Sequence, residues 1–435
     1  MTGGSTGGSA KGLRVVIVGG SMGGLLAGNM LHRAGCDVTV HERIDTELAE
    51  RGAGIATHSG LHAALESLGL SIQGAFGNGL ENRITLGTDG SILARHHLPQ
   101  IMATWGHLYR LLRSNFPEDR YVAGSNFTRF EQRGEGVLAR FEDGSSVQAD
   151  LLIGADGVRS TVRPQLWPEA VPEYAGYVAW RGILDEDRLS PEHRDILLSH
   201  FIVCLPPGEH VVGYPVAGAD GGMSPGRRRF NIVWYRLTTA EQLQRMQTDA
   251  SGHYHEAGIA PDLIERSWID EVRRAAEERL PPCLAEPMNL AHGIFFQTIV
   301  DLEVPRMVRG RVAMLGDAAF SARPHTGMGV VKATGDAVRL AEAIEANPGD
   351  LTRALSDYDE ERTRYGRSLV RFGRQLGTHI ETPGRSAEDR ALGDYLRQPE
   401  NVIQAISIPP PCSPLKVFRE DAHAGEACAL SRIPW

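Results

Sequence analysis

The stretch LRVVIVGGSMGG, residues 13–24, decides the fold class of this chain. Residues 13–18 are rich in β-branched apolar side chains, which is typical of a strand buried on both faces. After the glycines, residues 22–34 show the apolar spacing of a helix, and the segment DVTVHE at 37–42 predicts a second strand. Strand, glycine-rich turn, helix and strand in this order predict a βαβ unit at the start of an α/β fold.

The turn between the first strand and the helix matches a dinucleotide fingerprint with one departure. The usual GxGxxG pattern uses its first glycine for a tight turn and its second for close approach of the backbone to a pyrophosphate. Gly19 takes the first place here, and Ser21, whose hydroxyl can itself bond a phosphate oxygen, takes the second. Glu42 closes the second strand, where an acid can accept both hydroxyls of an adenosine ribose. The candidate cofactor-binding residues of this unit are Gly19, Gly20, Ser21, Met22, Glu42 and Arg43.

A ligand-free turn with Glu42 on the surface is the alternative interpretation of the same residues. The N-terminus of a helix offers unpaired N–H groups and a partial positive charge to an anion. Because the strand, the turn, the helix, the second strand and the acid all occur in the required order, nucleotide binding is the favoured interpretation.

Length and charge limit the class of protein. A chain of 435 residues suits two packed domains that together can bury a large cofactor. The composition, with 42% hydrophobic and 23% charged residues, excludes disordered and collagen-like chains. A net charge of −9 argues against nucleic acid or an anionic membrane as the main partner, because such surfaces bind clustered Lys and Arg.

The cysteines and the N-terminus predict a cytoplasmic soluble protein. The five cysteines are widely spaced and show no CxxC pattern, which favours free thiols in a reducing compartment. The first residues form a glycine- and serine-rich tail without the apolar stretch of a signal peptide. No apolar run reaches the length of a membrane span.

The predicted secondary structure changes along the chain. Alternating patterns at 84–100 and 120–150 predict antiparallel hairpins, VQADLLIGADG at 147–157 predicts another buried strand, and 239–278 predicts a helical insert. After residue 380 the chain is punctuated by prolines, as in PPPCSP, and is predicted to wrap the surface. The predicted units are a flexible tail at 1–11, a discontinuous nucleotide-binding domain at 12–171 and 301–350, a sheet domain at 172–300, and a C-terminal helix and extension at 351–435.

Two later motifs follow predicted strands. IGADGVRSTVR at 153–163 places Asp156 after a buried strand, and GDAAFSARPHTGMGVVKATGDA at 316–337 places Asp317 at a strand end. The second motif then opens a helix that runs to about Ala346. The N–H groups at such a helix start stabilise nearby negative charge by ~0.3–1 kcal/mol when exposed and up to ~2 kcal/mol when partly buried.

These three motifs, in this order, resemble the single-component FAD-dependent aromatic hydroxylases with the p-hydroxybenzoate hydroxylase fold. The resemblance covers residues 13 to about 345. It implies a Rossmann-like FAD-binding domain, an inserted antiparallel-sheet substrate domain at 172–300 and a C-terminal helical extension. It also implies FAD as cofactor, with NADH or NADPH as a transient electron donor.

The resemblance implies roles for matching residues. Asp317 is expected to bond the ribityl chain, and Asp156 with Gly157 to support flavin binding and the nicotinamide donor. In many relatives an Arg occupies the place of Trp105 in WGHLYRLL, so that the neighbouring Arg110 is the candidate substitute. The loop beside the isoalloxazine ring is expected at Pro324, Gly327, Met328 and Gly329.

The implied reaction is ring hydroxylation with NAD(P)H and O2 through a flavin hydroperoxide, because the cofactor carries chemistry that side chains cannot. The segments YVAWRGI, GRRRFNIVWYR and GDAAFSARPH are most similar to the 2,6-dihydroxypyridine hydroxylase branch, which favours a hydroxypyridine or a similar phenol as substrate. Candidate catalytic residues are His325, Arg181 and Tyr214. His325 can accept a ring-hydroxyl proton, but a loop-fixing hydrogen bond is an equally good interpretation, as are an ion pair for Arg181 and a core role for Tyr214.

Other functions stay open at this stage. A phenol hydroxylase or an epoxidase of natural-product biosynthesis is compatible with the motifs, whereas the missing WxWxIP pattern disfavours a halogenase. A non-catalytic FAD-binding redox sensor is the alternative outside enzymes. No metal site is predicted, because the histidine pairs at 96–97 and 253–255 lack an HExxH pattern. A homodimer is possible, and the sequence leaves NADH against NADPH undecided.

Overall fold

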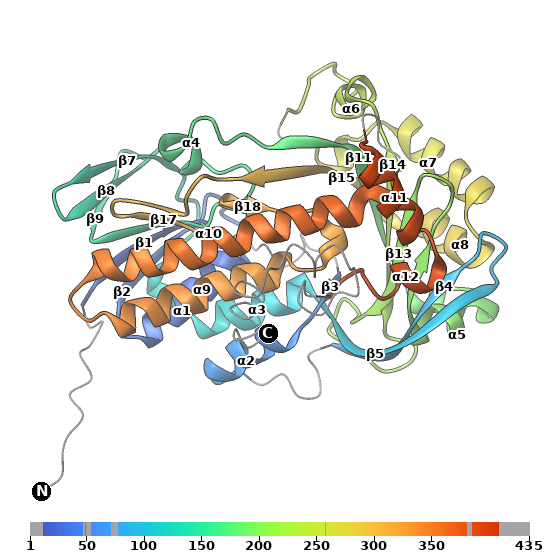
Figure 1. Cartoon of the computed structure of the whole chain (residues 1–435), viewed down its shortest axis with the longest axis horizontal. Coiled ribbons are helices and arrows are strands. Elements are labelled where there is room, and N and C mark those ends of the chain that lie inside the picture. The colour runs from blue at the N-terminus through green and yellow to red at the C-terminus, as the bar shows by residue number, and fades with distance from the viewer. Residues whose placement is uncertain are drawn as a thin grey trace, which may run out of the picture.

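The computed structural model describes residues 12–46, 48, 54–70, 77–256, 258–380 and 385–408. Its first layer is a six-stranded sheet in the order β16-β17-β10-β1-β2-β6 (Figure 1). All neighbouring pairs are parallel except β16 with β17. The strands are β1 (Arg14–Val18), β2 (Asp37–His41), β6 (Tyr121–Val122), β10 (Leu151–Gly154), β16 (Val308–Arg309) and β17 (Val312–Met314).

The predicted βαβ unit is confirmed. Helix α1 (Met22–Arg33) connects β1 to β2 and packs against α9 (Gly329–Ala346), which lies beside α10 (Leu351–Leu376) in Figure 1. Parallel register aligns Val18 with His41 and Gly154, and Gly154 with Met314. The turns that follow β1, β2, β10 and β17 therefore meet at one edge of the sheet, where α/β folds bind ligands.

The second layer is a nine-stranded sheet in the order β18-β15-β11-β14-β13-β12-β4-β5-β3, antiparallel except where β12 pairs with β4. Its alternating side chains define two faces. Trp180 and Trp234 pack on one face, while Tyr177 and Tyr235 pack on the other. The strands are β3 (Gly54–Ala56), β4 (Asn78–Leu86), β5 (Ile92–Thr104), β11 (Glu173–Asp185), β12 (His200–Cys204), β13 (His210–Val216), β14 (Arg229–Leu237), β15 (His292–Glu303) and β18 (Phe320–Ser321).

The tryptophan face of this sheet is covered by helices at the right of Figure 1. The helical insert predicted at 239–278 contains two separate helices, because α6 ends at Met246 and α7 begins only at Arg266. The helices of this layer are α5 (Pro191–Ser199), α6 (Ala240–Met246), α7 (Arg266–Arg279) and α8 (Pro282–Leu290).

A third, small sheet contacts β1 and β10 of the first layer, and short elements connect the strands of both layers. The predicted strand at 147–157 is two strands, since Ser146–Ala149 (β9) joins the small sheet while β10 enters the parallel one. The other elements are β7 (Phe127–Arg133), β8 (Gly136–Phe141), α2 (Ser59–Ser67), α3 (Trp105–Asn115), α4 (Arg163–Leu166), and 3-10 turns at Glu118–Arg120, Glu186–Arg188, Pro261–Leu263, Gly316–Ala318, Pro324–Thr326 and Gly377–His379.

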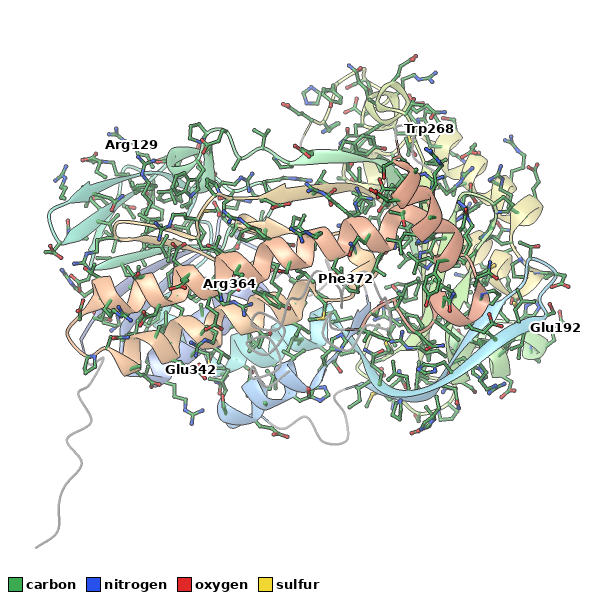
Figure 2. All side chains as sticks on the ribbon, in the orientation of Figure 1. Arg129, Glu192, Trp268, Glu342, Arg364 and Phe372 are labelled. Carbon is green, nitrogen blue, oxygen red and sulfur yellow. The ribbon has the colours of Figure 1, made fainter. Side chains whose placement is uncertain are left out.

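The C-terminal part differs from the sequence-based expectation. Helix α10 agrees with the C-terminal helix predicted to begin at residue 351, and it buries Phe372 while Arg364 reaches solvent (Figure 2). Two more helices follow, α11 (Ala387–Leu396) and α12 (Pro399–Val402). A surface wrap is wrong for residues 402–408, because most of their apolar side chains are buried against the nine-stranded sheet. The PPPCSP segment lies outside the described residues.

The three described cysteines, Cys36, Cys204 and Cys283, are buried and unbridged. Burial raises the pKa of the Cys36 thiol to about 11 and that of Cys204 to about 12, so neither is a thiolate at neutral pH. Within the described ranges, no helix has both the length and the apolarity that a bilayer crossing needs. The boundaries of the predicted domains stay a prediction.

Candidate active site

The glycine-rich turn packs tightly against the neighbouring strand. Gly19 has φ of +105°, and a Cβ there would lie 2.5 Å from the carbonyl oxygen of Ala155. A Cβ on Gly24 would lie 1.8 Å from the carbonyl oxygen of Gly19. The turn therefore needs glycine at both places, for the backbone angle at the first and for close approach at the second.

The backbone of this turn is held by the acid that ends the second strand. Gly20 N donates to Glu42 Oε2 at 2.7 Å, and Ile44 N donates to Glu42 Oε1 at 3.0 Å. Ser21 precedes α1 without a side-chain capping bond, which leaves its hydroxyl available to a ligand. The N–H groups of the first helical turn at Met22 point to the same edge, so the turn suits an anion.

The second motif is tied to the third. Asp156 Oδ2 accepts the backbone N–H groups of Thr161 at 2.6 Å and Val162 at 3.1 Å, while its buried Oδ1 has no partner among the described atoms. Burial raises the pKa of this carboxyl. Arg163 donates to the carbonyl oxygen of Ala318 at 3.2 Å, and this bond joins the turn after β10 to the turn after β17.

The third motif contains a buried cation that the sequence did not single out. Asp317 is 51% exposed at the sheet edge, and its Oδ1 lies 3.6 Å from Nζ of Lys332. Lys332 is 2% exposed, and its ammonium has no hydrogen-bond acceptor within the described part of the chain. Nearby Asp336 accepts Gly316 N at 2.9 Å and pairs with Arg362 at 2.7 Å. A lysine inside the apolar helical run VVKATG was the available signal for this position.

The loop before α9 consists of a 3-10 turn followed by a left-handed glycine. Pro324–Thr326 form a 3-10 turn, Gly327 follows with φ of +64°, and Met328 is fully buried. Met328 N donates to Thr326 Oγ1 at 3.2 Å, and α9 begins at Gly329 with no acidic residue in its first turn. An anionic group above this loop would meet the positive end of the helix dipole.

His325 belongs to a cluster of three buried histidines. Its Nε2 lies 2.9 Å from the hydroxyl of Tyr177, and its ring stacks on His210 with centroids 5.2 Å apart. His379 Nε2 lies 2.9 Å from His210 Nδ1, and His379 Nδ1 lies 2.5 Å from the carbonyl oxygen of Leu376. Burial lowers the pKa of all three rings, that of His379 to about 4, so the cluster is neutral at physiological pH.

This histidine cluster also has the ligand atoms of a metal centre, with nitrogens within 4.8 Å of one another. Three neutral histidines can bind Zn²⁺, but here four of the six ring nitrogens are already engaged in hydrogen bonds. The group contains no carboxylate or thiolate, and the charge of Arg323 already disfavours protonation of His325. A buried dication would therefore lack a counter-charge, and we interpret the cluster as a hydrogen-bonding site.

The other predicted substrate residues lie on the tyrosine face of the nine-stranded sheet. Tyr214 is buried and stacks on Phe201 with centroids 5.4 Å apart, and its hydroxyl would lie 2.9 Å from a Cβ on Gly54. Arg181 donates to Gln297 Oε1 at 3.1 Å. Its positive charge acts on the pKa of the Tyr214 hydroxyl, which burial raises.

Two predicted cofactor contacts stand apart from these clusters. Arg110 is exposed on α3, while Trp105 stacks on Tyr109 with centroids 5.2 Å apart. Arg43 follows the second strand, and its charge helps to lower the pKa of Arg159 in the turn after β10, although burial is the main cause. Arg43 and Arg159 thus place two cations near the sheet edge that holds Glu42.

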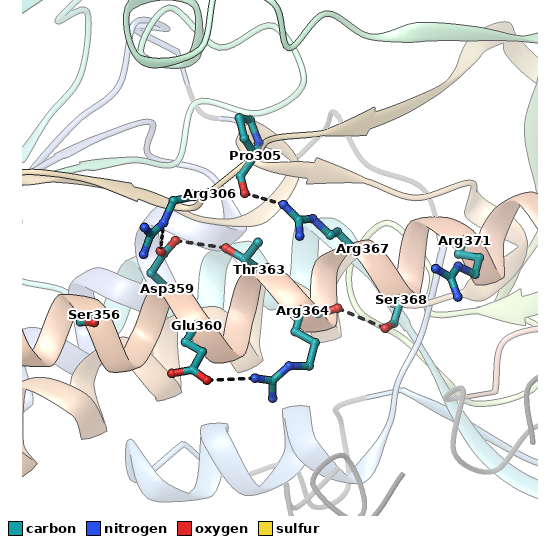
Figure 3. Close-up of a pocket in the computed structure, with 10 residues that line it drawn as sticks. All are labelled: Pro305, Arg306, Ser356, Asp359, Glu360, Thr363, Arg364, Arg367, Ser368 and Arg371. Carbon is teal, nitrogen blue, oxygen red and sulfur yellow. Dashed lines mark hydrogen bonds and ion pairs between the residues drawn. The ribbon is translucent and has the colours of Figure 1, made fainter. Parts of the chain in front are cut away.

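A polar hollow of roughly 630 Å³ lies along the outer side of α10 (Figure 3). Arg306 pairs with Asp359 at 2.5 Å, Arg364 with Glu360 at 3.1 Å, and Arg367 donates to the carbonyl oxygen of Pro305 at 2.6 Å. None of the residues that line it is aromatic, and its charges are largely paired with one another. It does not fit an aromatic substrate.

Three turns meet at one edge of a parallel sheet, and a histidine-bearing loop contacts the aromatic face of a second sheet, which is the arrangement of a nucleotide-binding domain joined to a second sheet layer. A family model described as FAD binding domain-like matches residues 174–301. The chain is 30% identical over 376 residues to 2,6-dihydroxypyridine 3-monooxygenase of Paenarthrobacter nicotinovorans, covering 85% of this chain and 92% of that relative. It is also 30% identical to 3-amino-4-hydroxybenzoate 2-monooxygenase of Streptomyces cremeus, covering 87% and 90%.

Solved structures agree with this assignment. The structure of 2,6-dihydroxypyridine-3-hydroxylase from Arthrobacter nicotinovorans gives a TM-score of 0.80 at 28% identity, over 86% of this chain and 94% of that one. Klebsiella pneumoniae HpxO complexed with FAD and uric acid has the same fold, with a TM-score of 0.74 at 23% identity, over 96% and 97%. The chain belongs to the family of FAD-dependent aromatic monooxygenases that includes 2,6-dihydroxypyridine 3-monooxygenase.

Proposed function

We propose that this enzyme hydroxylates a hydroxypyridine, or a closely similar phenol, with NAD(P)H and O2. The observation that carries the proposal is the convergence of the three motif turns at one sheet edge, next to a loop whose His325 faces the tyrosine face of the second sheet. The relative with a dihydroxypyridine name supports the ring class. A cytoplasmic location stays a prediction, and the choice between NADH and NADPH and between monomer and homodimer stays open.

FAD fits the residues present. The glycine turn at 19–24 packs closely against its neighbours and leaves the Ser21 hydroxyl without a capping bond, and the buried ammonium of Lys332 and the unpartnered Oδ1 of Asp156 are polar atoms that a ligand would satisfy. We propose that Glu42 holds the adenosine ribose, Gly20 and Ser21 the pyrophosphate, and Asp317 the ribityl chain, with the ring above residues 324–329. FAD supplies the oxygen activation when bound.

The chain's own contribution to the chemistry is orientation and proton handling. Burial holds His325 neutral and makes it a weak base, so its ring can accept a hydrogen bond from a ring hydroxyl and draw on that proton at neutral pH. Its buried Nδ1 has no partner among the described atoms, and we propose that it makes this contact. Tyr177 fixes the ring through the opposite nitrogen. Such withdrawal of a proton makes the substrate ring more electron-rich.

A substrate panel tests the proposed function. The purified FAD-loaded protein is given hydroxypyridines and phenols, with NAD(P)H consumption followed spectroscopically and products identified by mass spectrometry. A hydroxylated pyridinol is the expected product. A phenol or an alkene epoxide as the only product would favour the alternative hydroxylase or epoxidase, and a flavin that no nicotinamide reduces would favour the redox sensor.

Replacement of Asp317 by Ala should weaken FAD retention. A hydrogen bond that involves a charged group contributes about 1.5–3 kcal/mol, which corresponds to a rise of about 10- to 100-fold in the dissociation constant of FAD. Flavin fluorescence titration of apoprotein measures this constant. Asp317→Asn, which keeps a hydrogen-bond acceptor, should lie between wild type and Asp317→Ala, and unchanged flavin content in Asp317→Ala would contradict the assigned role.

Replacement of His325 by Asn should lower the rate of hydroxylation while FAD stays bound. General base catalysis by a positioned side chain contributes about 10²–10⁴-fold, and the lowered pKa of His325 places the expected loss at the lower end of this range, because Asn cannot take up a proton. Product formation is measured by chromatography, and flavin content by absorbance. The exposed His253 gives a matched control as His253→Asn. Equal rates in the two variants would show that His325 only fixes the loop.

A further inference from the structure

A buried arginine with no carboxylate partner among the described residues holds the last described segment of the chain. Arg83, on β4, is 1% exposed and donates to the carbonyl oxygens of Ile406 at 2.5 Å and of Ile403 and Ser407 at 3.4 Å. It also donates to Gln100 Oε1 at 2.5 Å and lies over the ring of Phe201. All these acceptors are neutral. A buried guanidinium costs free energy unless hydrogen bonds compensate it. The hydrogen bonds to the last described segment are therefore needed to keep Arg83 buried.

We define residues 399–408 as the C-terminal strap. The strap is fixed at its start by a second bond, in which Thr85 Oγ1 donates to the carbonyl oxygen of Pro399 at 2.8 Å. Val402, Ile403 and Ile406 are buried in the same apolar cluster as the tyrosines of the sheet face. The strap therefore packs against the tyrosine face of the nine-stranded sheet and is not a surface extension.

The end of the strap touches the loop before α9. Ser407 N donates to the carbonyl oxygen of His325 at 2.9 Å. A Cβ on Gly327 would lie 2.7 Å from the Ser407 side chain, so the loop and the strap are in van der Waals contact. Ser407 has φ of +54°, a left-handed backbone that no other non-glycine residue of the described chain adopts. Such conformations persist where the surroundings impose them, and they cluster at functional sites.

We propose that Arg83 is a positioning residue that, by holding the C-terminal strap against the 324–327 loop, fixes His325 and covers the side of the tyrosine face where the proposed substrate would bind. The strap then determines which rings fit between the loop and the tyrosine face. This inference rests on the proposed function for its substrate side, whereas the contact between strap and loop can be tested without any turnover.

The test is Arg83→Met in the FAD-loaded enzyme, with two readouts. Without the guanidinium the strap should detach, so cleavage by elastase after the small aliphatic residues Val402 and Ala405 should be at least tenfold faster. NAD(P)H consumption should continue, but the fraction that yields hydroxylated product should fall at least fivefold as hydrogen peroxide rises, and KM for the ring should increase more than kcat changes. Arg95→Met, an exposed arginine on the paired strand β5, is the matched control and should match wild type in both readouts.

Each contrary outcome is decisive. Unchanged cleavage would overturn the role of Arg83 as an anchor, and faster cleavage with unchanged coupling and KM would reduce it to a structural contact. If Arg83→Met does not fold, Thr85→Val removes only the Pro399 bond and should shift cleavage and coupling in the same direction by about twofold; no shift would overturn the proposal. If wild type hydroxylates no ring, the proposed function fails, and cleavage together with the flavin spectrum still tests the strap.

Discussion

Gly24→Ala should abolish tight FAD binding, even though alanine is the better helix former. In an exposed helix this exchange would stabilise the helix by up to about 1 kcal/mol. Here the new methyl group would lie 1.8 Å from the carbonyl oxygen of Gly19 and 3.4 Å from Ile17 Cγ2. The carbonyl is backbone and cannot rotate away, so α1 must move off the turn. Overpacking of this kind costs about 1–3 kcal/mol.

The displacement acts on the residues that bind the cofactor, because Gly20 and Ser21 lie between the two groups that clash. We expect the dissociation constant of FAD to rise by about 10- to 100-fold, together with a lower melting temperature of the apoprotein. Gly23→Ala is the matched control in the same helix, since its methyl group would meet the flexible end of Leu315 at 2.7 Å and Ala333 Cβ at an ordinary contact distance of 3.7 Å, but no backbone atom among the described residues outside its own helix. Equal affinity in the two variants would show that close packing at Gly24 does not shape the site.

The parts that sequence patterns predicted are those fixed by local periodicity. The βαβ unit and the helices that begin near Gly329 and Leu351 follow from apolar spacing within one segment. The predicted helical insert at 239–278 is interrupted because Asp249 forms a turn after α6, in which its Oδ1 accepts a hydrogen bond from Ser251 N at 2.8 Å. Side-chain bonds of this kind compete with the helix and leave little trace in hydrophobic periodicity.

The parts that sequence patterns missed depend on contacts between distant segments. His210 and His379 meet His325 only because strand register and the end of α10 bring them together. Arg83 gave no signal, since an arginine in an alternating strand normally faces solvent. The strap carried one overlooked signal, the apolar residues Val402, Ile403 and Ile406, but the prolines that follow suggested a surface segment.

Acidification should unfold this enzyme in a pH range where ordinary carboxylates are still charged. Burial lowers the pKa of His41, His58 and His379 to about 4, and that of His210 and His325 well below 6.5. The unfolded chain binds protons at these sites near pH 6.5, whereas the folded chain does not. Stability is therefore complete above pH 6.5 and is lost as the pH falls from 6.5 toward 4.

The expected loss is large. A histidine whose pKa drops from 6.5 to about 4 contributes ~2 kcal/mol of this loss at pH 5 and ~3 kcal/mol once both states are protonated. The combined loss from a few such residues reaches the unfolding free energy of 5–15 kcal/mol that is typical of a domain. Urea unfolding at pH 8, 6.5, 5.5 and 5 measures the decrease, and the slope of unfolding free energy against pH gives the number of protons taken up. His379→Gln should reduce that number by about one, because glutamine does not titrate. A wild-type slope near zero between pH 6.5 and 5 would mean that these rings are hydrated, and hence that the histidine cluster beside the 324–327 loop is open to water.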